Sequence, residues 1–112
     1  MLVEKISYSF VKTYEANDFH FLGHFPNFPV FPGIYLLDEV LSSMKLMYSW
    51  RKYIIEQGRF FKKVTPNMEL IFHVNVEIYA DYLNLVSDIT CKEDKIAKFK
   101  LTLYKVEDNY VT

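Results

Sequence analysis

The sequence predicts an α+β domain in which a curved antiparallel sheet is wrapped around one long central helix. Two observations lead to this prediction. Apolar and polar side chains alternate before position 15 and again over most of the chain after position 67, as they do in half-buried strands. Between these regions lies a single long segment of helical periodicity. Because strands and helix are segregated, an antiparallel sheet packed on one helix is the arrangement that buries both apolar faces.

The size and composition of the chain indicate one globular domain spanning residues 1–112. Hydrophobic residues make up 51% of the 112 positions and charged residues 24%, which is typical of a protein with a packed core. The 13 basic and 14 acidic residues nearly cancel, so we expect no nucleic-acid partner. We expect neither a signal peptide nor a membrane span, and the single cysteine, Cys91, fits a reducing compartment. These features together predict a cytoplasmic protein.

The first predicted element is a strand from Leu2 to Tyr14. Most of its even positions carry large apolar side chains, and polar or charged residues occupy most of the odd ones. The apolar even positions are Leu2, Ile6, Tyr8, Phe10 and Tyr14. The residues from Glu15 to Asp18 have the composition of a turn and end this strand.

A proline-rich stretch follows, from Gly23 to Gly33. Pro26, Pro29 and Pro32 fix the backbone angle φ at every third residue, which excludes a helix and makes the segment stiff. Gly33 ends the stretch where the predicted helix begins, and the first amides of a helix have no partner within it. The segment therefore places an imidazole, His24, ahead of a helix start that offers backbone donors.

The long helix is predicted from Gly33 to about Trp50. Apolar side chains cover about half of its circumference, and Asp38 shares a narrower polar strip with Ser42, Lys45 and Ser49. The residues from Arg51 to Gly58 are expected to form a polar exit from the helix, with Gly58 as a stop signal, and Arg59 to Val64 a short strand.

Three further strands complete the predicted sheet. The segment from Met68 to Ala80 has the clearest alternation of the chain, Leu83 to Cys91 continues it, and Ala97 to Tyr104 closes it. The charged residues from Lys92 to Lys95 are expected at the tip of the last hairpin. A sheet of this extent should curl around a single helix.

The chain also resembles a known family. Gly23-His24-Phe25-Pro26, Pro29-Val30 and Pro32-Gly33, with an acidic residue five positions after Gly33, are similar to the active-site signature of the hot-dog-fold 3-hydroxyacyl-acyl carrier protein dehydratases. The resemblance continues through Arg59-Phe60, Pro66 and the closing hairpins. It implies a hot-dog fold and a hydro-lyase that converts a 3-hydroxyacyl thioester to a trans-2-enoyl thioester in the synthesis of fatty acids or related polyenes or polyketides. It also implies a homodimer or a higher even oligomer.

The resemblance assigns roles to particular residues. His24 would take the proton from C2 of the substrate, the Gly33 amide would stabilise charge on the thioester oxygen, and Asp38 would protonate the departing hydroxyl. Phe25, Phe28, Pro32 and Ser42 are candidate substrate-binding residues, and Ser42 stands where the family usually has glutamine. No cofactor is expected. No metal site is expected either, because the spacing of His20 and His24 suits a metal only on a helix.

Alternatives remain for the residues and for the function. His24 could instead cap a backbone carbonyl in a loop, and Asp38 could belong to a merely solvated strip. Arg59, Lys62 and Lys63 are candidates for docking an acidic carrier protein, or they form a solvated rim. The competing functions are a hot-dog acyl thioesterase and a non-catalytic acyl-binding protein; the His-Phe-Pro sequence favours dehydration.

Overall fold

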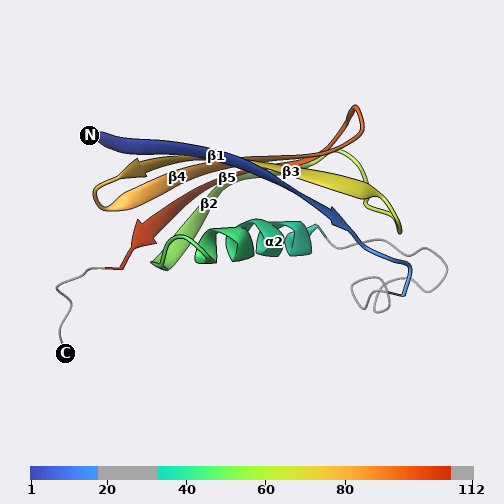
Figure 1. Cartoon of the computed structure of the whole chain (residues 1–112), viewed down its shortest axis with the longest axis horizontal. Helices are drawn as coiled ribbons and strands as arrows, with labels where there is room; N and C mark the ends of the chain where they lie inside the picture. The colour runs from blue at the N-terminus through green and yellow to red at the C-terminus, as the bar shows by residue number, and fades with distance from the viewer. Residues whose placement is uncertain (18–32, 107–112) are drawn as a thin grey trace.

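The computed structural model of this protein describes residues 1–17 and 33–106. Within them it contains strand β1 (Leu2–Thr13), helix α2 (Ile34–Lys45) and strands β2 (Trp50–Phe60), β3 (Glu69–Tyr79), β4 (Tyr82–Cys91) and β5 (Asp94–Lys105) (Figure 1). The strands form one five-stranded sheet in the order β1-β3-β4-β5-β2, and all neighbouring strands run antiparallel. The predicted α+β architecture is confirmed.

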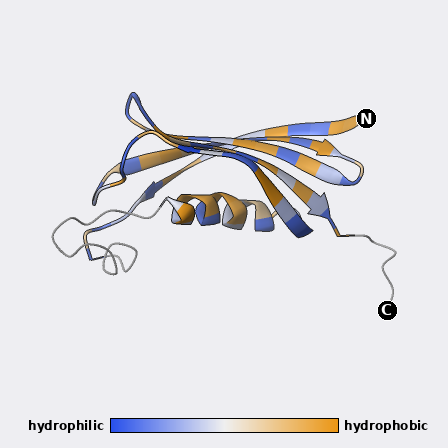
Figure 2. Ribbon diagram, turned by 180° about the vertical axis from the view of Figure 1, so that it is seen from behind, coloured by the Kyte–Doolittle hydropathy of each residue, from blue (hydrophilic) through white to orange (hydrophobic). Residues whose placement is uncertain are grey.

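The predicted strand before the helix and the three predicted strands after position 67 are also confirmed. Their alternation puts one set of side chains against α2 and the other on the outer face, and bands of opposite hydropathy alternate along the strands in Figure 2. In β3 the buried residues are Leu70, Phe72, Val74, Val76 and Ile78. The hairpin between β4 and β5 turns at Lys92, whose φ of 57° is in the left-handed region.

The core lies between the sheet and one side of the helix. Helix α2 runs along a single face of the sheet (Figure 1). Its buried side chains are Leu36, Leu37, Val40, Leu41 and Met44. Full burial of an aliphatic side chain of this size contributes about 1.5–3 kcal/mol, so this stripe is sufficient to fix the helix on the sheet.

The predicted end of the helix was wrong. Helix α2 stops at Lys45, five residues before Trp50, and the amides of Met47 and Tyr48 both donate to the Met44 carbonyl oxygen at 2.9 Å. No glycine or proline marks this end in the sequence, and the apolar pattern continues through Met47 and Tyr48. Chain reversal is achieved by this tight turn, which delivers Trp50 to the edge of the sheet.

The predicted polar exit over Arg51 to Gly58 and the predicted short strand over Arg59 to Val64 were also wrong. One strand, β2, replaces them and pairs with β5 from Trp50 opposite Lys105 to Phe60 opposite Ala97. The register shifts between Ile55 and Gln57, so the residues after this irregularity lose the simple alternation.

Strand β2 is an edge strand with an uncovered inner face. Tyr53, Ile55 and Phe60 pair with the inner-face residues of β5, yet they are 43%, 45% and 57% exposed. Their partners on β5, such as Leu101 and Leu103, are buried. The helix therefore covers the middle of the sheet and leaves an apolar strip beneath β2. Within the described ranges, no helix has the length and apolar character needed to cross a membrane.

Candidate functional site

A cavity of about 420 Å³ opens where helix α2 begins. Its walls come from three parts of the chain: the first turn of α2, the end of β2 and the loop that follows β2. The lining residues are Gly33, Ile34, Leu36, Phe60, Phe61, Lys62, Lys63 and Val64. The cavity thus combines apolar walls with two lysines and a helix start, a composition suited to a ligand with an apolar part and a polar or anionic part.

Gly33 is the N-cap residue of α2. Its backbone is in the right-handed helical region, and its carbonyl oxygen accepts the first hydrogen bond of the helix from the Leu36 amide at 3.0 Å. The amides of Gly33 and Ile34 precede this bond, so they have no acceptor within the helix. Aligned peptide dipoles add partial positive charge at this end. The first turn of α2 contains no acidic side chain to compensate it.

The absence of a side chain at Gly33 is required by Phe60. A Cβ atom at position 33 would lie 2.3, 2.7 and 2.8 Å from three carbons of the Phe60 ring, well inside van der Waals contact. The same ring packs edge-to-face on Phe99, with centroids 5.6 Å apart. Phe60 therefore holds the end of β2 against the helix start, and glycine makes that approach possible.

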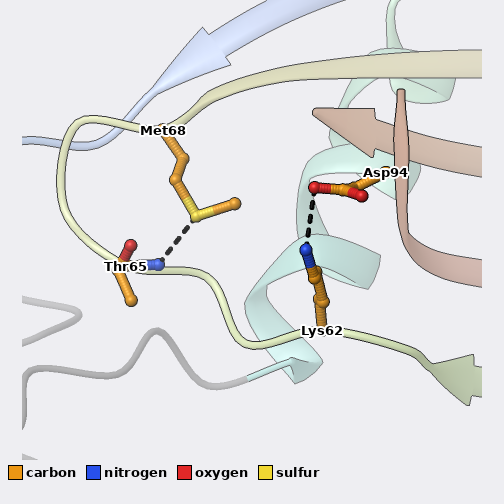
Figure 3. Close-up of polar contacts among 4 residues, drawn as sticks. All are labelled: Lys62, Thr65, Met68 and Asp94. Carbon is orange, nitrogen blue, oxygen red and sulfur yellow. Dashed lines mark hydrogen bonds and ion pairs between the residues drawn. The ribbon is translucent and has the colours of Figure 1, made fainter. Parts of the chain in front are cut away.

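The loop after β2 carries the cations of the cavity. Lys62 forms an ion pair with Asp94 at the β4–β5 hairpin, with 2.8 Å between Nζ and Oδ2, and the Thr65 amide donates to Met68 Sδ at 3.1 Å (Figure 3). These contacts fix the loop at two points. Lys62 is thus partnered within the chain, whereas Lys63 has no ion pair among the described residues.

Arg59 lies on the outer face of β2 rather than in the cavity wall. Its guanidinium carbon is 5.4 Å from the centroid of the Phe61 ring, and its cross-strand neighbour is Lys98. Lys100 is the next outer residue of β5, opposite Gln57. On its other side Lys98 is paired with Asp88 of β4, so a carboxylate of the chain itself lies beside these two cations. Lys98 and Lys100 are not among the predicted docking residues, although the alternation of the last strand indicates that both side chains point outward.

Asp38 is the fifth residue of α2, and its side chain is exposed. It follows Ile34, a cavity residue, by four positions and so lies one turn further along the same flank of the helix. It is not part of the cavity wall formed by the described residues. Asp38 thus lies one helical turn beyond the cavity residue Ile34, and its role as the acid stays a prediction.

Ser42 lies in a different cavity. This second space, of about 580 Å³, lies between α2 and β1, and none of its lining residues borders the Gly33 cavity. Its neighbour Ser43 donates to the Val40 carbonyl oxygen at 2.6 Å and shares a hydrogen bond of 2.7 Å with the Tyr8 hydroxyl. Burial raises the pKa of the Tyr8 phenol, while the Ser43 hydrogen bond acts in the opposite direction. The structure does not bring Ser42 together with Gly33.

The other predicted site residues, His24, Phe25, Phe28 and Pro32, lie outside the described residues. Among the residues that are described, no three histidine, cysteine, aspartate or glutamate side chains form a group able to hold a metal ion.

Comparison with known proteins identifies the fold and the family. The solved structure "The Dehydratase Heterocomplex ApeI:P from Xenorhabdus doucetiae" superposes with a TM-score of 0.72 at 18% identity, covering 94% of this chain and 97% of that one. A probable thioesterase from Bartonella henselae superposes with a TM-score of 0.62 at 10% identity, covering 94% of each chain. The five-stranded sheet with its helix is thus a hot-dog fold, which dehydratases and thioesterases share.

Sequence comparison separates these classes. The family model described as ApeI-like, ApeI dehydratase, matches residues 3–102. The FabZ 3-hydroxyacyl-[acyl-carrier-protein] dehydratase of Lactobacillus helveticus is 30% identical over 95 residues, covering 77% of this chain and 64% of its own. That of Ehrlichia chaffeensis is 33% identical over 73 residues, covering 59% and 51%. The chain thus spans about half the length of the Ehrlichia chaffeensis relative and less than two thirds of the Lactobacillus helveticus one. The protein belongs to the ApeI-like dehydratase family, within the hot-dog dehydratases that the sequence motif predicted.

Proposed function

We propose that this protein is a hydro-lyase that removes water from a 3-hydroxyacyl thioester and yields a trans-2-enoyl thioester. The substrate would be carried on an acyl carrier protein, in the synthesis of fatty acids or of related polyenes or polyketides. The observation that supports this most directly is the apolar cavity at the Gly33 helix start, in a chain that matches a dehydratase family over residues 3–102. No cofactor is part of the proposal.

The reaction needs three functions, and the sequence motif supplies a residue for each. His24 takes the proton from C2, and the electron pair moves onto the thioester oxygen. The backbone amide at Gly33 stabilises the resulting negative charge, since fixed donors directed at developing charge are a large catalytic term. Asp38 gives a proton to the C3 hydroxyl as the C3–O bond breaks, and water leaves as the C2–C3 double bond forms.

A second copy of the chain would complete the site. Asp38 is exposed on α2, and the inner residues Tyr53, Ile55 and Phe60 are exposed although apolar. A second β2 that continued the sheet would satisfy the edge backbone and cover this strip. Each site would then combine His24 of one copy with Asp38 of the other. The structurally similar ApeI is a member of a heterocomplex, so a related second dehydratase chain is the alternative outcome of the experiment below.

The carrier protein would approach the basic side of the cavity. Arg59 and Lys63 are available as cations, and Lys100 extends the positive surface on β5, whereas Lys98 lies opposite Asp88 of β4. Lys62 contributes less in this proposal because Asp94 already pairs with it. Replacing Arg59 and Lys63 by alanine should raise KM for carrier-bound substrate and leave KM for a short-thiol substrate unchanged. Equal changes for both substrates would contradict docking at this surface.

The decisive experiment is incubation of the purified protein with a 3-hydroxyacyl thioester while both products are followed. We expect the ultraviolet absorbance of an enoyl thioester to rise and free thiol to stay at background. Release of free thiol would instead indicate a thioesterase. His24→Ala and Asp38→Asn should each be inactive, and mixing them should restore one of the two sites in every mixed dimer, about one site in four when subunits exchange freely. If the mixture stays inactive although subunits exchange, the shared site is wrong.

A further inference from the structure

Phe60 is an exposed aromatic side chain with an unusual position. Its ring occupies the space that a side chain at Gly33 would need, 2.3 Å from the expected Cβ position, and its other face is open, since the residue is 57% exposed. Phe99, which it contacts edge-to-face, is buried. An exposed ring of this kind contributes less to the core than Phe99 does, so its placement on the helix start calls for another explanation.

The ring borders both the Gly33 cavity and the exposed apolar strip of β2. On one side is the Gly33 cavity, with Phe61, Lys63 and Val64 in its wall. On the other side is the uncovered inner strip of β2, where Gly58 and Ile55 follow Phe60 along the same face. Gly58 has no side chain, and a Cβ atom there would come no closer than 3.6 Å to Phe99. The strip therefore lacks a side chain at the position next to Phe60, and the Phe99 ring lies beneath it.

We propose that Phe60 determines which acyl chains the protein accepts, by closing the passage from the Gly33 cavity to the inner strip of β2. This rests on the proposed function, because it assumes that the thioester carbonyl binds at Gly33. With the carbonyl at Gly33 and the carrier arm toward the lysines, the acyl chain extends toward Gly58 and meets the Phe60 ring first. Short 3-hydroxyacyl chains end before the ring, and longer chains require the ring to move.

The test is a chain-length series measured on Phe60→Ala, Phe60→Leu and the unaltered protein. We expect kcat/KM of the unaltered protein to stop rising at a short acyl length, and Phe60→Ala to extend the rise by two or more methylene groups. Each newly buried methylene should raise kcat/KM about fourfold, so two should raise it roughly fifteenfold. Phe60→Leu should fall between the two. Phe61→Ala is the matched control, since Phe61 is also an exposed ring in the cavity wall but is absent from the atoms nearest Gly33.

A binding series keeps this inference separate from the proposed function. Non-hydroxylated acyl-pantetheine thioesters of the same lengths are titrated by calorimetry, which needs no turnover. If no 3-hydroxyacyl thioester is dehydrated but the length preference in binding still shifts in Phe60→Ala, only the proposed reaction fails. If Phe60→Ala changes affinity equally at every length, or if Phe61→Ala produces the same shift, Phe60 does not set specificity. Thermal unfolding of each variant verifies that it is folded.

Discussion

The contact between Gly33 and Phe60 gives the sharpest stability prediction. Replacing Gly33 by alanine adds one methyl group, which would lie 2.3 Å from the nearest ring carbon of Phe60. Because Phe60 is largely exposed, its ring can rotate away instead of forcing the backbone apart. The cost is then the loss of the edge-to-face contact with Phe99, whose centroid lies 5.6 Å away.

The size of the effect follows from three contributions. Alanine is a poorer N-cap residue than glycine, which costs roughly 0.5–1.5 kcal/mol. Alanine also restricts the unfolded chain, and at the right-handed helical backbone of Gly33 this gains about 0.4–1 kcal/mol. These two contributions nearly cancel. The displaced aromatic contact is worth about 0.5–1.5 kcal/mol, so we expect Gly33→Ala to lower the free energy of unfolding by about 1 kcal/mol.

A double-mutant cycle isolates this contact. Urea unfolding of the unaltered protein, Gly33→Ala, Phe60→Ala and the double variant gives the coupling energy between the two positions. We expect coupling of about 1 kcal/mol, because Gly33→Ala should cost almost nothing once the ring is gone. If the two effects simply add, within about 0.3 kcal/mol, the ring does not depend on the missing side chain and the reasoning is refuted.

Three further variants test other parts of the structure. Phe72→Ala removes a ring that is 0% exposed in β3, and it should lower the free energy of unfolding by about 3–5 kcal/mol; a loss below about 1 kcal/mol in urea would show that the core is not packed there. Burial raises the pKa of Tyr8, so its contribution to stability is complete below about pH 10, the ordinary tyrosine pKa, and is lost as the pH rises through the higher folded value. Tyr8→Phe should therefore flatten the fall of unfolding free energy in that range, and an unchanged slope would contradict it. Ile55→Lys puts a charge on the exposed inner face of β2, and sedimentation should find a folded monomer; a persistent dimer would place the interface elsewhere.

The elements predicted correctly are those whose two faces differ. In β3, buried Phe72 and Val74 flank half-exposed His73, so the burial of one face is directly visible as alternation in the sequence. The same reasoning predicted the closing hairpin. The start of the helix was predicted from Gly33 because the preceding prolines cannot be helical.

Strand β2 escaped prediction because neither of its faces is buried within one chain. Arg51 and Lys52 precede Tyr53 without alternation, and the irregularity after Ile55 shifts the pattern again. Its β-branched and aromatic residues favour a strand, whereas its charges and Gly58 favour a polar exit from the helix, which is what the sequence predicts. The adjacent helix end was missed for a related reason, since Met47 continues the apolar stripe beyond the last helical residue, Lys45.

The sequence predicted which residues belong to the candidate site but not how they are arranged in space. Sequence reasoning put Gly33 at a helix start and Lys63 within a short strand from Arg59 to Val64, and the structure brings both to one cavity. The separation of Ser42 from that cavity depends on which flank of α2 faces β1, which the helical periodicity alone does not specify. The contact with Phe60 depends on the pairing of β2, which we had not predicted.

The order of strands in the sheet also has a consequence for how the protein assembles. Strands β3, β4 and β5 pair with their neighbours in sequence, whereas β1 and β2 each join the sheet through a partner far along the chain. Local hairpins close quickly and distant pairings slowly, so the two edges should dock onto a preformed three-stranded meander. Gly33 and Phe60 belong to the late-docking part. Hydrogen exchange should accordingly be slower in β4 than in β2, and mild destabilisation would dismantle the Gly33 cavity while the meander persists.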